Sequence, residues 1–209
     1  MFTGIIQEKA RVVSIVRAAE LVTIRAAFPE GFLRGVSTGA SIALNGCCLS
    51  VTSFTNSEAT FDLVPETVAR TSFKDIQEGD ALNAERSLKF GDEVGGHILS
   101  GHVDTTASIL EIALLGRSRV VTFAVEKEWG KFLFEKGYVA INGASLTITN
   151  VNQGTGTFKV SLIPETLAKT TFSDLVTGAI VNIEVDKSTQ AIVLTVERVL
   201  LERGLSKSG

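Results

Sequence analysis

The sequence predicts an all-β fold of two tandem six-stranded antiparallel Greek-key barrels, produced by an internal duplication and followed by a C-terminal amphipathic helix. Three observations support this prediction: a repeat that covers nearly the whole chain, short β-rich runs between turn signals in each copy, and a helical periodicity that begins only where the second copy ends. With 209 residues, 44% of them apolar, the chain is long enough to bury the cores of two ordinary domains.

The repeat keeps its order along the chain. Three pairs of segments match: TGIIQEKARVVSI (3–15) with SGHVDTTASILEI (100–112), NGCCLSV (45–51) with NGASLTI (142–148), and LVPETVARTSF (63–73) with LIPETLAKTTF (162–172). The third pair is displaced by two residues relative to the others, and we expect that insertion near residues 154–156. The expected division is a first barrel at 1–97, a second barrel at 98–187 and a C-terminal helix at 188–209.

Each copy contains six β-rich runs separated by turn residues. In the first copy they are KARVVSIV (9–16), ELVTIRAAF (20–28), SIALN (41–45), CLSVTSF (48–54), ATFDLV (59–64) and DALNAERS (80–87). Six short strands with little helix favour a small closed barrel over a parallel sheet. Before the last run, Pro65 and Pro164 begin the segments PETVART and PETLAKT, which predicts one short helical turn in each copy.

The segment KSTQAIVLTVERVLLERG (187–204) lies beyond both copies and has a helical period. One face is apolar and holds Ile192, Val193, Val196, Val199 and Leu200. Either Ser188 or Thr189 could cap the start of the helix, and Gly204 could end it. The helix either covers one end of a barrel or joins subunits, since its apolar stripe is wide.

Composition and charge exclude several classes of function. The 23 acidic and 20 basic residues give a net charge of -3 without long single-sign runs, so we expect no nucleic acid and no membrane as partner. One Trp, one Tyr and no basic stripe also argue against single-stranded nucleic acid. The first residues contain no apolar run long enough for a secretion signal, so we expect the protein in the cytoplasm.

The two cysteines are neighbours, Cys47 and Cys48. On a strand they point to opposite faces, which suits neither a disulfide nor a shared metal ion. Two histidines without HExxH or CxxC spacing leave too few ligands for a metal site, so none is expected.

Matching loops in two barrels predict two similar pockets. Residues 62–67 and 161–166 form such a pair, and the hydroxyls of Thr67 and Thr166 with nearby backbone groups suit a polar heterocycle or a polyol chain. The alternative is that Pro-Glu-Thr only starts a helix in each copy.

The copies differ at residues that can do chemistry. Cys48 aligns with Ser145, His102 aligns with Ile5, and His97 has no counterpart in the first copy. Thiol and imidazole are suited to nucleophilic and proton-transfer chemistry near neutral pH, so one pocket could react while both bind. The alternatives remain open: a strand cysteine is often a buried apolar residue, and a histidine between glycines can serve only a turn.

Taken together, MFTGII, NGCCLSV, GGHILSGHVD, the two PET segments and NGASLTI resemble the riboflavin synthase family of the α-chain type, from Met1 to the C-terminal helix. The resemblance implies a transferase without metal or redox cofactor that catalyses the last step of riboflavin biosynthesis. Two molecules of 6,7-dimethyl-8-ribityllumazine per site react; one gives a four-carbon unit to the other, yielding riboflavin and 5-amino-6-(D-ribitylamino)uracil.

The resemblance also implies an assembly. In the family, the N-terminal barrel of one subunit faces the C-terminal barrel of a neighbour, and two lumazines stack between them in a homotrimer joined by the C-terminal helices. Association with lumazine synthase, the lumazine-forming enzyme, is left open by the resemblance.

The resemblance assigns site residues in each barrel. The first pocket would comprise Gly4, Ile5, Ile6, Cys48, Leu49, Ser50, Asp62, Leu63, Val64, Pro65, Glu66 and Thr67. The second would comprise Gly101, His102, Val103, Lys136, Ser145, Leu146, Thr147, Ser161, Leu162, Ile163, Pro164, Glu165 and Thr166. Positions associated with activity are matched by Phe2, Ser41, Cys48, His102, Thr147 and Asp186. Ser50 departs from the usual Thr but keeps the hydroxyl.

An alternative of another class is a non-catalytic lumazine- or flavin-carrying protein of the same fold, as in accessory proteins of bacterial light emission. Those relatives depart from the family at the thiol and histidine positions. Because Cys48, His97 and His102 are all present here, the sequence favours the enzyme.

Overall fold

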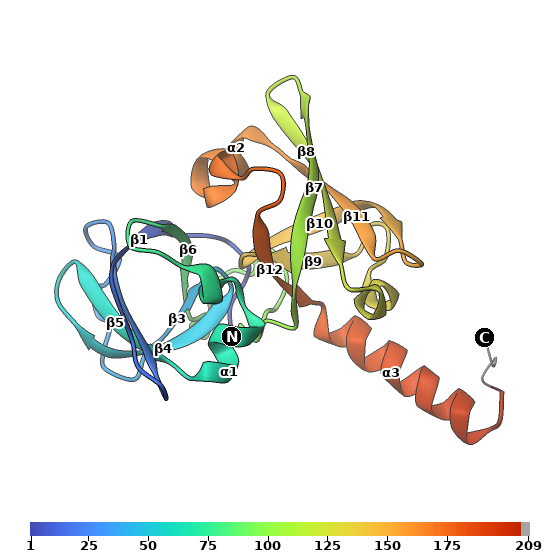
Figure 1. Ribbon diagram of the computed structural model, residues 1–209, viewed down its shortest axis with the longest axis horizontal. Coiled ribbons are helices and arrows are strands. Elements are labelled where there is room, and N and C mark those ends of the chain that lie inside the picture. Colours follow the sequence, from blue (N-terminus) through green and yellow to red (C-terminus); the bar gives the residue numbers. More distant parts are fainter. Residues whose placement is uncertain (206–209) are drawn as a thin grey trace.

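The computed structural model describes residues 1–205 and contains two closed barrels that lie side by side (Figure 1). The first barrel is built from β1 (Glu8–Arg17), β2 (Val22–Ala27), β3 (Ser41–Leu44), β4 (Cys47–Phe54), β5 (Glu58–Leu63) and β6 (Ala81–Arg86). The second is built from β7 (Thr105–Leu115), β8 (Ser118–Val125), β9 (Tyr138–Ile141), β10 (Ala144–Asn152), β11 (Thr157–Leu162) and β12 (Ile180–Val185).

Both barrels have the same topology. In the first, the strands close in the order β1-β2-β5-β4-β3-β6, and the corresponding strands of the second close in the same order, with every pair antiparallel. Strand β2 lies beside β5 rather than β3, which is the Greek-key arrangement. The predicted fold class is confirmed, because the alternation of buried and exposed residues along each strand lets one face fill a closed barrel.

Each barrel encloses its own apolar core. The first core contains Phe61 and Phe73, and the second contains Phe123, Phe158 and Phe172, each at most 1% exposed. The two extra residues of the second copy lie in the β10–β11 hairpin, where β10 and the following turn are each one residue longer than β4 and its turn. The insertion is therefore where the repeat predicted it.

Short helices follow β5 and β11, as the two PET segments predict. These are α1 (Pro65–Arg70) and α2 (Pro164–Lys169), each with proline at the first helical position. Short 3-10 helices follow them at η1 (Ser72–Asp75) and η3 (Thr171–Asp174), and a third, η2 (Lys127–Phe132), lies between β8 and β9.

The barrels meet through two tight turns. Asn45 and Gly46 join β3 to β4, and Asn142 and Gly143 join β9 to β10; all four residues have positive φ. Such Asn-Gly turns match the twist of a hairpin. A Cβ on Gly46 would lie 2.7 Å from the backbone nitrogen of Gly143, so the turns pack backbone against backbone.

Two asparagines fix this contact symmetrically. Asn83 of β6 donates Nδ2 to the carbonyl of Asn142, and Asn182 of β12 donates Nδ2 to the carbonyl of Asn45. Their Oδ1 atoms accept from the backbone nitrogens of the opposite barrel's η3 and η1. Because Asn83 and Asn182 are at most 1% exposed, each lost bond would leave an unsatisfied polar atom of these side chains in the interface.

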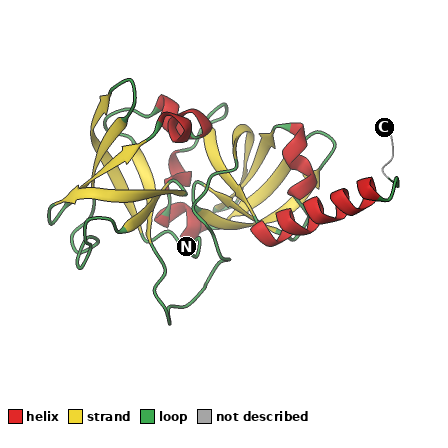
Figure 2. Cartoon of the chain, turned by 90° about the horizontal axis from the view of Figure 1, so that it is seen from below, coloured by secondary structure: helices red, strands yellow, loops and turns green. Residues whose placement is uncertain are grey.

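The C-terminal helix α3 (Lys187–Glu202) extends away from the second barrel (Figures 1 and 2). Its cap differs from the prediction: Asp186, not Ser188 or Thr189, accepts from the Thr189 nitrogen at 2.7 Å. A carboxylate at this position also complements the positive end of the helix. Gly204 ends the helix in the left-handed region, as predicted.

No residue of α3 is buried, and its apolar side chains are largely exposed. Val193 packs against the second core, and Glu197 accepts from Lys131 of η2 at 2.7 Å, but the rest of the stripe is uncovered. The last residues assigned to this helix from the sequence, 206–209, lie outside the described residues. Among residues 1–205, no helix is long and apolar enough to cross a membrane.

Candidate active site

The segment before each barrel lies between the two barrels and contacts both of them. Residues 2–7 precede β1, and the Gly4 carbonyl accepts from the Ser145 nitrogen of β10 at 2.9 Å. Residues 99–103 precede β7, and the Gly101 carbonyl accepts from the Cys48 nitrogen of β4 at 2.7 Å. The two segments also pair with each other, since Phe2 and Leu99 exchange backbone hydrogen bonds of 2.9 and 3.0 Å.

This crossing builds two composite pockets of about 270 and 280 Å³. One, the thiol pocket, takes most of its lining from the first barrel and is closed by residues 101–103 of the second; it is lined by Cys47, Cys48, Glu66, Thr67, Arg70, Thr71, Gly101, His102 and Val103. The other, the serine pocket, is closed by residues 4–7 and is lined by Gly4, Ile5, Ile6, Gln7, Ala144, Ser145, Leu146, Glu165, Thr166, Lys169 and Thr170. Nine lining positions of each pocket correspond under the repeat, and Gln7 and Leu146 have no counterpart in the lining of the thiol pocket.

The predicted grouping of the pocket residues is therefore corrected in one respect. The sequence grouped Gly4, Ile5 and Ile6 with Cys48, and Gly101, His102 and Val103 with Ser145. The structure exchanges these segments. The physical reason is that the Gly4 and Gly101 carbonyls each accept a backbone hydrogen bond from the opposite barrel, which the repeat alone could not distinguish from a contact within one copy.

The candidate reactive residues fall into two sets. Cys48 and His102 line the thiol pocket, and Phe2, which is 1% exposed, packs behind them, since a Cβ on Gly101 would lie 2.7 Å from both the Phe2 ring and the Cys48 Cβ. Ser41 lies on β3 opposite Ser50 of β4, and Thr147 is exposed on β10. Neither Ser41 nor Thr147 lines the two pockets, and Asp186 caps α3.

The remaining predicted binding residues are divided between core and surface. Leu49, Leu63, Leu146 and Leu162 belong to the barrel cores, with Leu146 also reaching the serine pocket. Exposed positions are occupied by Ser50, Asp62, Val64, Pro65, Lys136, Ser161, Ile163 and Pro164. Asp62 accepts from the Thr23 hydroxyl at 2.7 Å. Glu66 with Thr67 and Glu165 with Thr166 do line the pockets, at equivalent positions.

The two thiols have different environments, as their adjacency on a strand predicts. Cys47 lies in the first core, where burial and then the neighbouring Cys48 raise the pKa of its thiol to about 12. A thiol that stays protonated is a poor nucleophile. Cys47 therefore behaves as a small buried apolar residue, while Cys48 is the thiol that a ligand can reach.

His97 makes a contact that the sequence did not reveal. Its Nδ1 lies 2.6 Å from the Ser145 hydroxyl, and its ring stacks on Tyr138 at 5.2 Å. Burial lowers the pKa of His97, although Asp186 opposes this shift. The neutral imidazole beside a hydroxyl can accept or return a proton, so the serine pocket has an acid–base pair where the thiol pocket has Cys48.

Two further groups of side chains were missed. Arg70 and Lys169 bring one cation to each pocket, and Glu85 and Glu184 hold the crossing segments. The available signal was repetition, because PETVAR matches PETLAK and ALNAE matches IVNIE. Sequence reasoning used only the Pro-Glu-Thr part of the first repeat.

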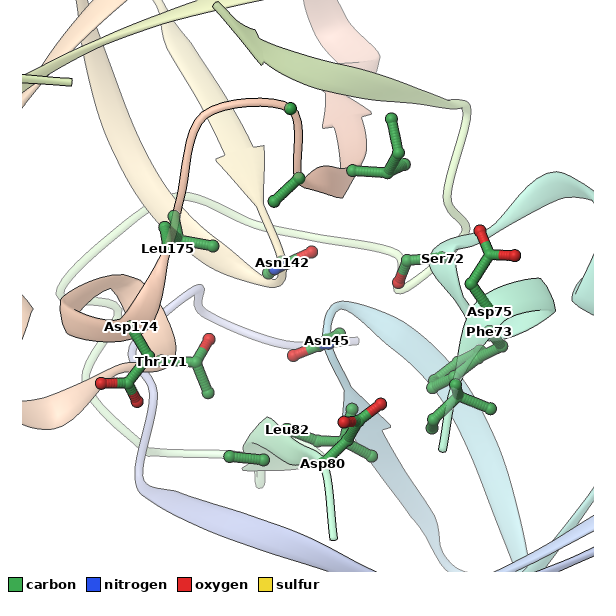
Figure 3. Close-up of a pocket in the computed structure, with 15 residues that line it drawn as sticks. Asn45, Ser72, Phe73, Asp75, Asp80, Leu82, Asn142, Thr171, Asp174 and Leu175 are labelled. Carbon is green, nitrogen blue, oxygen red and sulfur yellow. The ribbon is translucent and has the colours of Figure 1, made fainter. Parts of the chain in front are cut away.

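A larger cavity of about 500 Å³ lies between the barrels (Figure 3). Its lining includes Asn45, Asn142, Asp75, Asp80 and Asp174, and none of the predicted site residues. The two asparagines already accept hydrogen bonds across their own barrels, and the acidic groups disfavour an anionic ligand. The chemistry that the sequence predicted lies in the two smaller pockets.

Family comparison assigns both barrels. A model of the lumazine binding domain matches residues 3–87 and 100–186. The chain is similar to the riboflavin synthase of Escherichia coli (strain K12), with 45% identity over 204 residues covering 97% of this chain and 95% of that protein. It is also similar to the riboflavin synthases of Chlamydia pneumoniae, with 43% identity covering 98% of this chain and 99% of that protein, and of Bacillus subtilis (strain 168), with 39% identity covering 89% and 85%.

Solved structures share the fold. LumP complexed with riboflavin gives a TM-score of 0.82 at 24% identity, covering 90% of this chain and 100% of that chain. LumP complexed with 6,7-dimethyl-8-(1'-D-ribityl) lumazine gives a TM-score of 0.79 at 24% identity, covering 88% and 99%.

Proposed function

This chain belongs to the riboflavin synthase family and is an enzyme of the transferase class, and from that membership we propose how its two pockets carry out the reaction. Each pocket binds one 6,7-dimethyl-8-ribityllumazine. One bound molecule gives up a four-carbon unit and becomes 5-amino-6-(D-ribitylamino)uracil, and the other receives the unit and becomes riboflavin. Two identical substrates account for the atoms of both products, so no external oxidant or reductant is needed.

One observation supports this proposal above the others: the two pockets are built alike but carry different reactive side chains. Thr67, Arg70 and a crossing segment line the first, and their equivalents line the second. Cys48 and His102 in one pocket are replaced by Ser145 and Ile5 in the other. A reaction between two copies of one substrate requires two similar binding sites that favour different outcomes.

Binding rests on the shared features of the pockets. The threonine hydroxyls and nearby backbone groups can exchange hydrogen bonds with a ribityl chain or a heterocycle, and the cations Arg70 and Lys169 can donate to ring carbonyl oxygens. We propose the remaining family-matched residues, including Ser41, Ser50, Asp62 and Thr147, as ligand contacts that are completed when a second subunit faces the pocket.

We assign proton transfer to the side chains that differ between the thiol pocket and the serine pocket. In the thiol pocket, His102 is exposed to the ligand, and Cys48 is the reachable thiol. In the serine pocket, Ser145 contacts the ligand, and His97 behind it exchanges the proton. Much of the rate comes from holding two reactants in register, since orientation alone can account for roughly 7–11 kcal/mol of a barrier.

Assembly is part of the same proposal. The thiol pocket and the serine pocket of one chain are separate sites. A donor and an acceptor come face to face when the thiol pocket of one subunit meets the serine pocket of another. The uncovered apolar stripe of α3 supplies the contact for a homotrimer. The site of action proposed is the cytoplasm, and association with lumazine synthase is not needed for this chemistry.

The test is direct. Purified, metal-free protein is mixed with 6,7-dimethyl-8-ribityllumazine, and the riboflavin absorbance is followed against a protein-free control. Riboflavin formed at half the amount of lumazine consumed supports the proposal. Tight binding without turnover would contradict it and would indicate a carrier.

A further inference from the structure

Two buried carboxylates hold the crossing segments in place. Glu85 of β6 is 2% exposed and accepts from the Thr3 nitrogen, the Thr3 hydroxyl and the Gly4 nitrogen at 2.6, 2.7 and 3.0 Å. Glu184 of β12 is 3% exposed and accepts from the Ser100 nitrogen, the Ser100 hydroxyl and the Gly101 nitrogen at 2.7, 2.7 and 3.0 Å. The two arrangements are equivalent under the repeat.

Gly4 and Gly101, which these carboxylates bind, lie in close contact with the opposite barrel. Gly4 and Gly101 both have positive φ, and a Cβ on either would lie 2.5 Å from Ser145 or 2.7 Å from Cys48. Only glycine fits this approach. A small displacement of either segment therefore alters the distance to the reactive side chain of the pocket.

The same hydrogen bonds reach the next residue. The Ser100 hydroxyl that donates to Glu184 accepts from the His102 nitrogen at 3.1 Å, and the Thr3 hydroxyl that donates to Glu85 accepts from the Ile5 nitrogen at 3.3 Å. Each carboxylate thus sets the direction in which residue 102 or residue 5 enters its pocket. A neutral amide could not replace it, because its NH₂ group would face backbone N–H donors in a site closed to water.

We propose that Glu85 and Glu184 are positioning residues that act across the barrels: Glu184 of the second barrel shapes the thiol pocket, and Glu85 of the first barrel shapes the serine pocket. One barrel supplies most of the lining of each pocket. The carboxylate on which that pocket depends belongs to the other barrel. This inference deepens the proposed function and rests on it only in taking the two pockets as the reactive sites.

Alkylation of thiols tests this without measuring turnover. Iodoacetamide is added to the full-length protein, and peptide mapping by mass spectrometry follows Cys48 and Cys47 separately. Glu184→Gln should accelerate alkylation of Cys48 by about fivefold or more, because local opening of residues 100–103 uncovers it. Glu85→Gln should change that rate by less than about twofold. Glu111→Gln, an exposed carboxylate on β7, is the control for charge removal.

The reciprocal arm uses Ser145→Cys, which places a thiol at the equivalent position of the serine pocket. In that background Glu85→Gln should accelerate alkylation of the new thiol, and Glu184→Gln should not. Cys47 borders the thiol pocket but is 6% exposed and belongs to the first core, so its alkylation reports opening of that core. Glu184→Asp, which keeps the charge, should restore part of the protection of Cys48.

The crossed pattern distinguishes positioning from general support of the fold. Equal acceleration by both variants, or acceleration of Cys47 together with Cys48, would overturn the proposal. If the unmodified protein fails to form riboflavin, the proposed function is contradicted. The alkylation rates would still test the positioning role by themselves. Conversely, riboflavin formation with no crossed pattern would refute only the positioning role.

Discussion

At the residue scale, one exchange separates the two pockets. Cys48 and Ser145 occupy equivalent strand positions, and each backbone nitrogen donates to a crossing glycine. Behind Ser145 stands the buried imidazole of His97, whereas Cys48 has Phe2 and the exposed His102 nearby. The same backbone frame therefore presents a hydroxyl with a proton partner in one pocket and a thiol in the other.

Replacing Cys48→Ser should reduce turnover more than binding, because the hydroxyl keeps the polar surface of the pocket. We expect kcat to fall by about tenfold or more while the lumazine Kd changes by less than about threefold. Steady-state kinetics and equilibrium fluorescence titration measure the two quantities. Cys47→Ala is the matched control and should lower stability without lowering kcat per folded molecule. Proportional loss of both quantities would refute this division.

Burial of His97 predicts a pH dependence of stability. Its pKa is lowered from the ordinary value of 6.5 by burial, which Asp186 only partly offsets. Protonation would also place an N–H on Nε2, which has no partner among the described residues. The unfolded chain then binds more protons than the folded chain below pH 6.5, so stability falls as the pH drops through that value.

The matching experiment compares unmodified protein with His97→Asn in thermal unfolding between about pH 7.5 and pH 5. The variant should lose less stability on acidification than the unmodified protein. His102→Asn, which removes an exposed imidazole, is the control. An unchanged pH slope in His97→Asn would show that this histidine does not cause the acid sensitivity.

At the element scale, α3 contacts the rest of the chain through few side chains, among them Val193 on the second core and Glu197 with Lys131 of η2. Asp186 and Gly204 define its ends, but Ile192 and Val196 of its stripe are more than half exposed. We propose that this apolar surface contacts another chain, because exposed apolar patches of this kind mark interaction sites.

Deleting residues 190–209 should leave folded barrels that sediment as monomers and have little activity. The buried residues of both cores lie outside this segment, although Val193 packs against the second core from its surface, so the far-ultraviolet spectrum should keep its β signature. Val196→Glu in the full chain, which places a charge in the stripe, should weaken association in the same direction. A trimer of the truncated chain in sedimentation would overturn the assigned role.

At the scale of the whole molecule, the barrels behave as one unit because their turns and segments interlock. The Gly46–Gly143 contact, the two asparagines and the crossing segments all lie in the interface. Any side chain added at the turns must separate the barrels or distort a hairpin.

Gly143→Ala should lower the free energy of unfolding by about 1–3 kcal/mol more than Gly178→Ala. Both glycines have positive φ, but a Cβ at 143 would lie 2.8 Å from the Gly46 nitrogen, whereas nothing lies within 4 Å at 178. The difference between the two losses in the free energy of unfolding cancels the backbone strain common to both variants. It leaves the steric cost at the interface between the barrels. Chemical denaturation measures it, and equal losses would refute a tight contact.

Much of the fold followed from local patterns. Alternation along KARVVSIV or ATFDLV, proline at the start of PETVART and the period of 192–200 each depend on neighbours in sequence, and each element formed as predicted. The cap of α3 was missed because Asp186 also ends the preceding β-rich run. From the sequence alone, a residue at such a junction can be assigned to the strand or to the helix cap.

The sequence by itself determined the duplication, the two six-stranded barrels, the terminal helix and the family, because periodicity and repeated motifs are properties of the chain read in order. Only the tertiary structure decided which segment completes which pocket, and that His97 stands behind Ser145. A repeat is equally compatible with contacts inside one copy and between copies. The choice is made by hydrogen bonds between residues far apart in sequence, such as Ser145 with Gly4 and Cys48 with Gly101.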